Sequence, residues 1–368
     1  MKNFSPIGHT PAGVKSGKSF AENFEKHFHI PNRLQNASAE LVDSVNDWHF
    51  AMLNDVTRNE FYFKMLQHYI VPGQTKVAEI GAGSGILSLM AASLGAKSVI
   101  AIEGSRELCR LAQSNIEKNN LSSKVKVVNA MSIDVRTEDY PEYLPADILV
   151  SEIFGTLLLG ESSLDYINDF LVRGLLKKPI VLPRYGSQYA VLIECPKLRS
   201  LTSVNSYQGM DLSMMNQLRD TASVVFTKQY GFRLNSVPFK ALASPLKVFD
   251  LDFTKEKPGF LPLIQKRDLL ITSDGTCDAL VLFWSAYDYL DGKEICMSTS
   301  PSETSDNFCR DMQWGQAIQL VEFENSSTKL CNEDSREENY VNSGDRIEVM
   351  QRASQDSVLL QFGFRRIE

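Results

Sequence analysis

Hydrophobic positions along the chain follow two different rhythms, and the change falls near Pro183. Upstream of it, short apolar runs alternate with segments whose apolar residues recur at helical spacing. The runs predict strands at 76–80, 98–102, 124–128, 147–151 and 179–182, and the spaced segments predict helices at 85–95, 105–119 and 163–174. This alternation is typical of a parallel sheet covered by helices, so residues 76–183 are expected to form a Rossmann-like α/β domain.

Residues 184–368 show the alternation of polar and apolar positions that is typical of strands. The predicted β-rich stretches are Tyr189–Ile193, Leu269–Thr272, Cys277–Tyr287, Gln316–Phe323, Arg346–Arg352 and Val358–Phe364. They indicate an antiparallel β-sandwich or β-barrel. A helical, methionine-rich segment at about 199–228 interrupts this pattern. Its apolar residues suit an arm that grips a second subunit, although an ordinary surface helix would look the same.

Residues 1–75 form a third segment, which precedes both patterns. Its first 40 residues are of mixed composition and predict a flexible start, and whether they order only on cofactor binding is left open. Residues 44–70 predict one or two amphipathic helices with an aromatic stripe. The stripe consists of Trp48, Phe50, Phe61, Tyr62 and Phe63. We expect it to pack in the core, because aromatic side chains are mostly buried, with a lid over a ligand as the alternative.

Composition excludes several classes of protein. The net charge of −7 argues against direct nucleic-acid binding and suits a basic partner. No apolar run approaches the roughly 18 residues of a membrane helix. The six cysteines are scattered without a CxxC pair, which is typical of reduced thiols in a cytoplasmic protein; a nuclear pool is left open. All five histidines precede residue 69, so no metal site is expected.

The first candidate site is a glycine turn between the predicted strand 76–80 and the helix that follows. Gly81, Gly83 and Gly85 would allow positive φ angles and bring a ligand close to the backbone, at the positive end of a helix. Glu79 lies on the strand before the turn. Glu103 ends the next predicted strand, where an acid can bind both ribose hydroxyls.

Three interpretations of this turn are open: a tight turn without a ligand, a nicotinamide site, and a site for a nucleoside with a short polar tail. The spacing is GxGxG, and the third glycine of the dinucleotide fingerprint would fall at Ile86. S-adenosylmethionine (SAM) is a nucleoside with a short polar tail, and we expect it to be the ligand.

The second candidate site is the segment from Glu152 to Glu161, here called the two-glutamate loop. Two acids bracket an otherwise apolar loop that contains Gly155 and Gly160 and follows a predicted strand. Buried acids are costly unless they are paired, and a guanidinium group, planar with several N–H donors, would satisfy both. The alternative is two surface acids, one of which caps the next helix.

The glycine turn, Glu103 and the two-glutamate loop together resemble the protein arginine methyltransferase family, from about residue 45 to the end of the chain. The loop and an altered Thr-His-Trp segment are most similar to the monomethylating (type III) branch, the seventh member of the mammalian series. That member has two tandem modules, and this chain has the length of one. The resemblance implies a SAM-binding domain, a β-barrel, and a dimerisation arm that would pair two copies of the chain.

The resemblance also implies a role for each matching residue. It gives Glu152 and Glu161 the catalytic role of holding the target guanidinium. Its cofactor-binding residues are Arg58, which would hold the SAM carboxylate, Glu79, Gly81, Gly83, Gly85, Glu103, which would bind the ribose, and the adenine-contacting Met131 and Ser132. The expected substrate-pocket residues are Phe50, Met52, Asp55, Gln313 and Trp314.

Gln313 departs from the family pattern, because Met312-Gln-Trp314 stands where Thr-His-Trp is usual. The family histidine pairs with the acid that corresponds to Asp55; a neutral Gln313 can hydrogen-bond Asp55 but cannot form an ion pair. A tight pocket walled by Phe50, Met52 and Gln313 would disfavour a second methylation.

The expected function is therefore methyl transfer from SAM to arginine in proteins, giving ω-N-monomethylarginine and S-adenosylhomocysteine (SAH). A dimethylating enzyme and a SAM-dependent enzyme acting on a non-protein acceptor are alternatives. An inactive scaffold is a third, and it should have lost a glycine or a glutamate that this chain retains.

Overall fold

The computed structural model describes residues 17–24, 29–45, 47–204, 206–225, 233–324 and 339–367. The expected flexible start, as far as it concerns residues 1–16 and 25–28, lies outside the described residues. The chain begins with helices α1 (Asn32–Gln35), α2 (Ala39–Ser44), α3 (Asp47–Asn54) and α4 (Val56–Tyr69). The prediction of helices within 44–70 is confirmed. The side chain of Asp55 caps the N-terminus of α4 by accepting a hydrogen bond from the backbone N–H of Arg58 at 3.0 Å.

The aromatic stripe divides between core and surface. Phe61 and Tyr62 are buried, as expected. For the other three, the core interpretation is wrong: Trp48, Phe50 and Phe63 are exposed by 43%, 60% and 37%. For Phe63 the reason is its direction: one face of α4 is buried, and Phe63 lies off that face.

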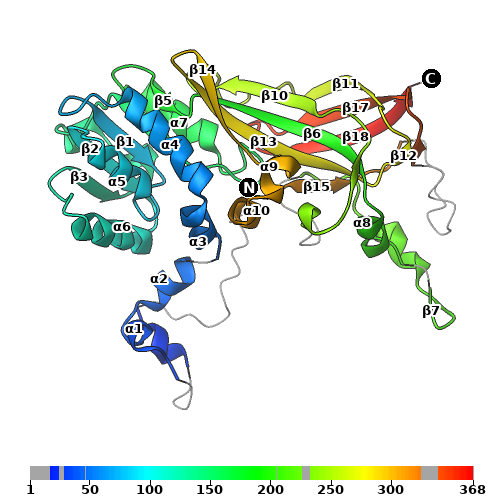
Figure 1. Ribbon diagram of the computed structural model, residues 1–368, viewed down its shortest axis with the longest axis horizontal. Helices are drawn as coiled ribbons and strands as arrows, with labels where there is room; N and C mark the ends of the chain where they lie inside the picture. Colours follow the sequence, from blue (N-terminus) through cyan, green and yellow to red (C-terminus); the bar gives the residue numbers. More distant parts are fainter. Residues whose placement is uncertain are drawn as a thin grey trace.

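The parallel sheet contains β1 (Lys76–Ile80), β2 (Ser98–Glu103), β3 (Val125–Asn129), β4 (Ile148–Ser151) and β5 (Val181–Leu182) in the order β3-β2-β1-β4-β5. Its helices are α5 (Ile86–Ser93), α6 (Arg106–Lys118) and α7 (Ser163–Val172), which confirms the predicted alternation (Figure 1). The chain leaves β1 on one side for β2 and returns on the other side for β4. Ligands in such sheets bind at the carboxyl ends of the strands beside this reversal, which is where both candidate sites begin.

The second half of the chain forms curled antiparallel sheets. A six-stranded sheet joins β6 (Tyr185–Glu194), β9 (Lys240–Ala241), β10 (Leu246–Asp252), β13 (Ala279–Leu290), β14 (Lys293–Ser298) and β15 (Ala317–Leu320). A three-stranded sheet joins β11 (Ile264–Leu270), β17 (Arg346–Ala353) and β18 (Leu360–Ile367), and a short pair joins β12 (Gly275–Thr276) to β16 (Tyr340–Val341). Helices α9 (Pro301–Ser305) and α10 (Phe308–Gln313) lie between β14 and β15.

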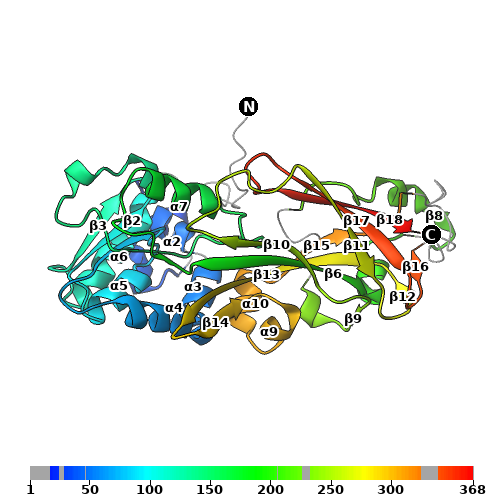
Figure 2. The ribbon, with the colours of Figure 1, turned by 90° about the horizontal axis from the view of Figure 1, so that it is seen from above.

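These sheets give the expected antiparallel β-sandwich or β-barrel a more specific form. Within the described residues the six-stranded and three-stranded sheets are separate, and an isolated bridge between Ala243 and Ile271 links their edges (Figure 2). The architecture is therefore a curled half-barrel. The predicted strand at 269–272 is also displaced, because β11 ends at Leu270, and strands β10 and β14 and helices α9 and α10 were not predicted.

The predicted arm is only partly helical. It contains α8 (Pro196–Leu201), a hairpin of β7 (Ser206–Tyr207) and β8 (Met210–Asp211), and a 3-10 helix over Ser213–Leu218. The hairpin forms because Gln208 and Gly209 adopt positive φ angles of 48° and 81°, which a helix does not allow. Figure 1 shows this arm projecting from the half-barrel. Residues 205 and 226–228 of the predicted segment lie outside the described residues.

One hydrophobic core runs from the parallel sheet into the half-barrel, and the two-glutamate loop lies within it. Leu157, Leu158 and Leu159 of the loop are buried by 98% or more. Gly186 on β6 leaves space for the loop, since a Cβ there would lie 2.6 Å from Leu158 Cδ2. Among the described residues, no helix is long and apolar enough to cross a membrane, no His/Cys/Asp/Glu cluster suits a metal ion, and the cysteines are free.

Candidate active site

The glycine turn has the backbone conformation that its residues predict. Gly81, Gly83 and Gly85 have φ angles of 73°, 52° and 85°, a region that other residues rarely adopt. A Cβ on Gly81 would lie 2.6 Å from Ile153 Cγ2, so glycine is also needed for the approach of the two-glutamate loop. The turn and the loop are therefore packed directly against each other.

Glu103 holds this turn through its side chain. Its carboxylate accepts hydrogen bonds from the backbone N–H of Gly83 at 2.8 Å and of Ser105 at 2.7 Å. The residue is 9% exposed, yet it lines a pocket at the end of β2. A carboxylate oxygen can accept more than one hydrogen bond, so Glu103 is fixed in place and still able to bind hydroxyl groups of a ligand.

The pocket beside the turn has a volume of about 280 Å³. Five expected site residues line it: Gly81, Glu103, Met131, Ser132 and Glu161. Sequence reasoning missed Ile153 and Tyr166, which complete the wall toward α7. The structure thus brings residues that follow three different strands, β1, β2 and β3, together with the far end of the two-glutamate loop.

Ser132 is positioned by a side chain from the neighbouring helix. Arg173, just after α7, donates hydrogen bonds to the backbone carbonyls of Ser132 at 2.7 Å and of Val135 at 2.5 Å. The hydroxyl of Ser132 is buried and has no hydrogen-bond partner within the part of the chain that the structure describes. Buried polar groups are nearly always satisfied, so an unpaired hydroxyl in the wall of a pocket is expected to meet a ligand or water.

Glu79 lies beneath the turn and does not line the pocket. It is 1% exposed and accepts a short hydrogen bond from the hydroxyl of Ser88 on α5. Burial raises the pKa of Glu79 to about 8. Its protonated form therefore dominates at neutral pH, and its place in the structure is a support for the turn.

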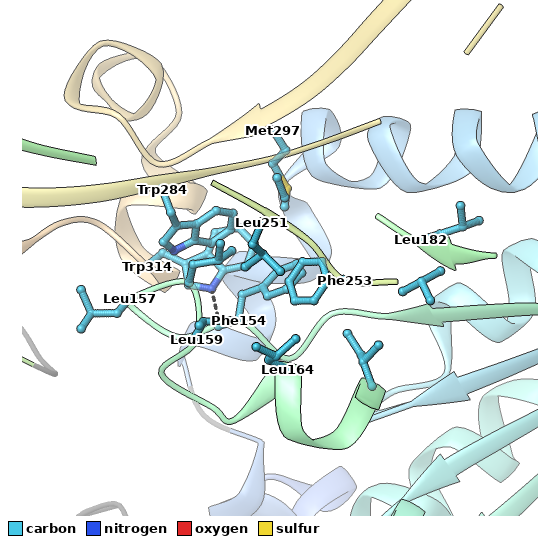
Figure 3. Close-up of a cluster of buried hydrophobic side chains, with 14 of the residues drawn as sticks. Phe154, Leu157, Leu159, Leu164, Leu182, Leu251, Phe253, Trp284, Met297 and Trp314 are labelled. Carbon is cyan, nitrogen blue, oxygen red and sulfur yellow. Dashed lines mark hydrogen bonds between the residues drawn. The ribbon is translucent and has the colours of Figure 1, made fainter. Parts of the chain in front are cut away.

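Two tryptophans of the half-barrel anchor the two-glutamate loop. The indole N–H of Trp314 donates to the carbonyl of Phe154, and that of Trp284 donates to the carbonyl of Gly155, both at 2.9 Å. Their rings lie 4.9 Å apart, and Trp284 also packs edge-on against Phe154, as Figure 3 shows. Trp314 is 3% exposed, so it supports the loop from within the core and does not line the pocket.

Glu152, at the start of the loop, is buried and ion-paired. Arg58 Nη2 lies 2.9 Å from Glu152 Oε2, and the side chains are 2% and 6% exposed. Gln313 Nε2 donates to the same oxygen at 3.5 Å. Burial raises the pKa of Glu152, and the positive charge of Arg58 opposes that rise. Arg58 Nε is also buried and has no partner among the described residues, so this guanidinium has capacity for a further anionic ligand.

Glu161, at the other end of the loop, is open to the pocket. The protein around it and the negative charge of Glu152 raise the pKa of Glu161 to about 7. The two carboxylates are therefore close enough to interact. Among the described residues Glu161 forms no ion pair, so two interacting acids, one of them unpaired, favour the binding of a cation.

Asp55 has a different partner from the one expected. The two side-chain nitrogens Nε and Nη2 of Arg310 donate to its carboxylate at 2.9 and 3.1 Å, and Asn307 donates at 2.9 Å. Gln313 instead bonds Glu152. The expectation that Gln313 would hydrogen-bond Asp55 is thus wrong, because Arg310, one helical turn earlier on α10, already forms an ion pair with Asp55. Burial would raise the pKa of Asp55, but these hydrogen bonds hold it below its usual value.

Phe50 and Met52 do not line the pocket either. Phe50 is 60% exposed, and Met52 on the same helix is 9% exposed. Neither belongs to the pocket wall. Among the residues hypothesised to restrict a second methylation, Gln313 is the one that contacts a glutamate of the loop.

Arg310 and Trp284 were not predicted as site residues, although each has a distinctive sequence context. Arg310 stands three residues after Asn307, whose side chain caps α10, and its charge is unusual so close to the apolar stretch that follows. Trp284 lies in the middle of a long apolar strand, where its N–H needs a buried acceptor. That acceptor belongs to a loop far away in the sequence.

Comparison with known proteins gives a consistent result. The profile of the family "Ribosomal protein L11 methyltransferase (PrmA)" matches residues 60–162. An arginine N(omega)-methyltransferase of Streptomyces achromogenes is 34% identical over 264 residues, which cover 70% of this chain and 68% of that protein. Protein arginine N-methyltransferase 7 of Drosophila ananassae is 27% identical over 318 residues, 82% of this chain, but the match spans only 43% of that protein.

A solved structure agrees at the level of the fold. A chain of the Trypanosoma brucei PRMT1 enzyme-prozyme complex superposes with a TM-score of 0.68, covering 88% of this chain and 93% of that chain. At 18% sequence identity this similarity concerns the fold alone.

Proposed function

The chain belongs to the family of SAM-dependent arginine N-methyltransferases, and from this premise we propose that it methylates the guanidinium group of arginine side chains in proteins. One observation carries the proposal: the two-glutamate loop joins a buried, ion-paired Glu152 to Glu161, which faces the pocket beside the glycine turn. Two acids at the edge of this pocket would suit the binding of a cation beside a nucleoside in the pocket.

The residues around the pocket fit SAM. Glu103 would bind the ribose hydroxyls, and Ser132, whose buried hydroxyl lacks a partner, would face the adenine together with Met131. Arg58 is paired with Glu152 and is not part of the pocket wall; it would bind the carboxylate through donors that include its unpaired Nε. When bound, SAM supplies a methyl group on a positively charged sulfur, which a nitrogen nucleophile can attack.

The two glutamates would prepare that nucleophile. A guanidinium remains protonated in proteins and is a poor nucleophile. The guanidinium would donate charge-assisted hydrogen bonds to Glu152 and Glu161, which would orient it and draw its positive charge to one side, leaving one nitrogen more reactive. As the new N–C bond formed, the bond from the methyl carbon to the SAM sulfur would break to leave SAH, and that nitrogen would lose a proton. Glu161 would accept it, because its raised pKa of about 7 makes it a stronger base than an ordinary carboxylate.

Methyl transfer to defined acceptors tests this proposal. The protein is incubated with SAM and an arginine-rich peptide, and the product is analysed by mass spectrometry. A peptide with citrulline in place of arginine has the same shape but no cation, and serves as the control. We expect methylation of the arginine peptide alone and its loss in Glu161→Gln. No transfer to any arginine acceptor would refute the proposal.

Free arginine is a second candidate acceptor, favoured by the Streptomyces relative, whose name specifies arginine without a protein. Parallel reactions with L-arginine and the peptide separate the two. A higher kcat/KM for L-arginine would identify a small-molecule enzyme and exclude the protein substrate.

We further propose that the product is monomethylarginine. Support comes from the similarity of the two-glutamate loop to the type III branch and from Gln313, which occupies the hydrogen-bonding position at Glu152. The product is identified after prolonged incubation with excess SAM. Abundant dimethylarginine would contradict this proposal without affecting the previous one.

The arm supports a proposal that the chain acts as a homodimer. Its exposed apolar residues include Tyr207, Met214 and Leu218, at 63%, 67% and 79% exposure. Such a surface is expected to be covered by another molecule. Deleting 199–228 should yield a monomer with little activity, measured by sedimentation and by methyl transfer. A fully active monomer would contradict the role of the arm.

A further inference from the structure

Arg310 connects the half-barrel to the helix that carries Arg58. Its guanidinium is 1% exposed and is held at all three nitrogens: Nε and Nη2 donate to Asp55, and Nη1 donates to the carbonyl of Ser298 on β14 at 3.1 Å. The Asp55 carboxylate receives a third side-chain donor from Asn307. This pair joins residues 255 positions apart.

Asp55 in turn fixes the beginning of α4. Its side chain caps that helix by accepting the backbone N–H of Arg58, and the side chain of Arg58 extends to Glu152. Arg58 therefore stands three residues after one buried carboxylate, that of Asp55, and its guanidinium pairs with another, that of Glu152. Helix α10 reaches Glu152 by two routes: directly through Gln313, and through Arg310, Asp55 and Arg58.

The charges of these groups explain why Arg310 is needed. A buried carboxylate without a counter-ion is strongly unfavourable and takes the nearest available cation. If Asp55 lacked Arg310, it would compete for Arg58, three residues along the chain, and Glu152 would then lose its own partner. With Arg310 in place, Asp55 is satisfied and Arg58 is available to Glu152.

We propose that Arg310 is a positioning residue of the active site: by neutralising Asp55, it keeps the guanidinium of Arg58 at Glu152 and thereby sets the affinity for the carboxylate end of SAM. This inference rests on the proposed role of Arg58 in binding the cofactor carboxylate. Arg310 lies outside the pocket, and its predicted effect on ligand binding is separate from its effect on stability.

Three variants separate these effects. Arg310→Met removes the charge and retains most of the side-chain volume. The double variant Asp55→Asn/Arg310→Met removes both charges, and asparagine still caps α4. Arg184→Met is the control, because Arg184 also pairs through two nitrogens, with Asp252 in the half-barrel, although it is more exposed than Arg310, and it is not part of the pocket. SAH binding is measured by calorimetry well below the melting temperature of every variant.

Arg310→Met should weaken SAH binding by at least about tenfold, which corresponds to about 1.4 kcal/mol. The double variant should bind within about threefold of the wild-type protein, because Asp55 no longer competes for Arg58. Arg184→Met should lower the melting temperature and leave the Kd unchanged. An unchanged Kd in Arg310→Met would overturn the inference, and so would a double variant with the full deficit of the single one.

Should Arg310→Met not fold, Arg310→Lys and the double variant decide the question. Lysine retains the positive charge beside Asp55, so its Kd should stay within about threefold of the wild-type value; a tenfold loss would overturn the argument from charge. The wild-type measurement separates this inference from the proposed function. Failure of the wild-type protein to bind SAH would refute both, whereas normal binding in Arg310→Met would refute only the positioning role.

Discussion

Glu161 gives the proposed reaction a pH dependence whose size can be worked out. Only its ionised form can hold a guanidinium and accept a proton. Its neighbours raise the pKa to about 7 in the free protein, so the active form is lost as the pH falls through 7. About one molecule in eleven is ionised at pH 6 and about ten in eleven at pH 8. We therefore expect kcat/KM for an arginine peptide to rise about tenfold between these values.

The bound cation changes this dependence in a way that can be checked. A guanidinium beside Glu161 favours the ionised carboxylate and lowers its pKa. Because kcat reports the complex and kcat/KM reports the free protein, kcat should vary less than kcat/KM over the same range. Initial rates are measured with labelled SAM at saturating cofactor, once with dilute and once with saturating peptide.

Two controls separate the titration of Glu161 from other effects of pH on the rate. Glu161→Gln should lose the step near pH 7 along with most of its activity, and SAH binding to the wild-type protein is measured at each pH to exclude an effect on the cofactor. A kcat/KM that is flat or falls from pH 6 to pH 8, with constant SAH affinity, would refute the reasoning.

Three further variants test the supports of the site. Trp314→Phe leaves the carbonyl of Phe154 without its buried donor, which should cost about 1–3 kcal/mol of unfolding free energy and reduce kcat; chemical denaturation that gives no loss would contradict the anchoring role. Glu79→Gln should become progressively more stable than the wild-type protein between about pH 4.5 and 8, because the wild-type carboxyl keeps its proton when folded and the unfolded chain releases it; melting curves that stay parallel across this range would exclude that explanation. Gly81→Ala should abolish SAH binding, since its φ is 73° and the new Cβ would lie 2.6 Å from Ile153; a normal Kd would show that the turn can rearrange.

The local features of this protein could be read from the sequence. Strand β1 was predicted at its observed bounds, because Val77 to Ile80 form a buried run that a glycine turn ends. The positive φ angles of that turn follow from its residue types, and the acid at the end of β2 lies in the pocket as its spacing suggested. Each of these inferences depends on residues close together along the chain.

The pairings across the molecule could not be read in this way. Arg310 finds Asp55 at a separation of 255 residues, and nothing local to either residue specifies that pairing over one with Gln313. The same limit applies to Trp314, because a tryptophan beside a substrate and one beneath a loop have the same sequence pattern. Arm residues 206–211 were predicted as helix because their apolar spacing fits one, whereas Gly209 favours the hairpin observed.

The most direct test of the account is a crystal structure of the protein with SAH and an arginine peptide. We expect the guanidinium to lie within about 2.7–3.2 Å of carboxylate oxygens of both Glu152 and Glu161, with SAH in the pocket lined by Glu103 and Ser132. A peptide arginine bound elsewhere, with Glu161 turned away from the pocket into solvent, would contradict it.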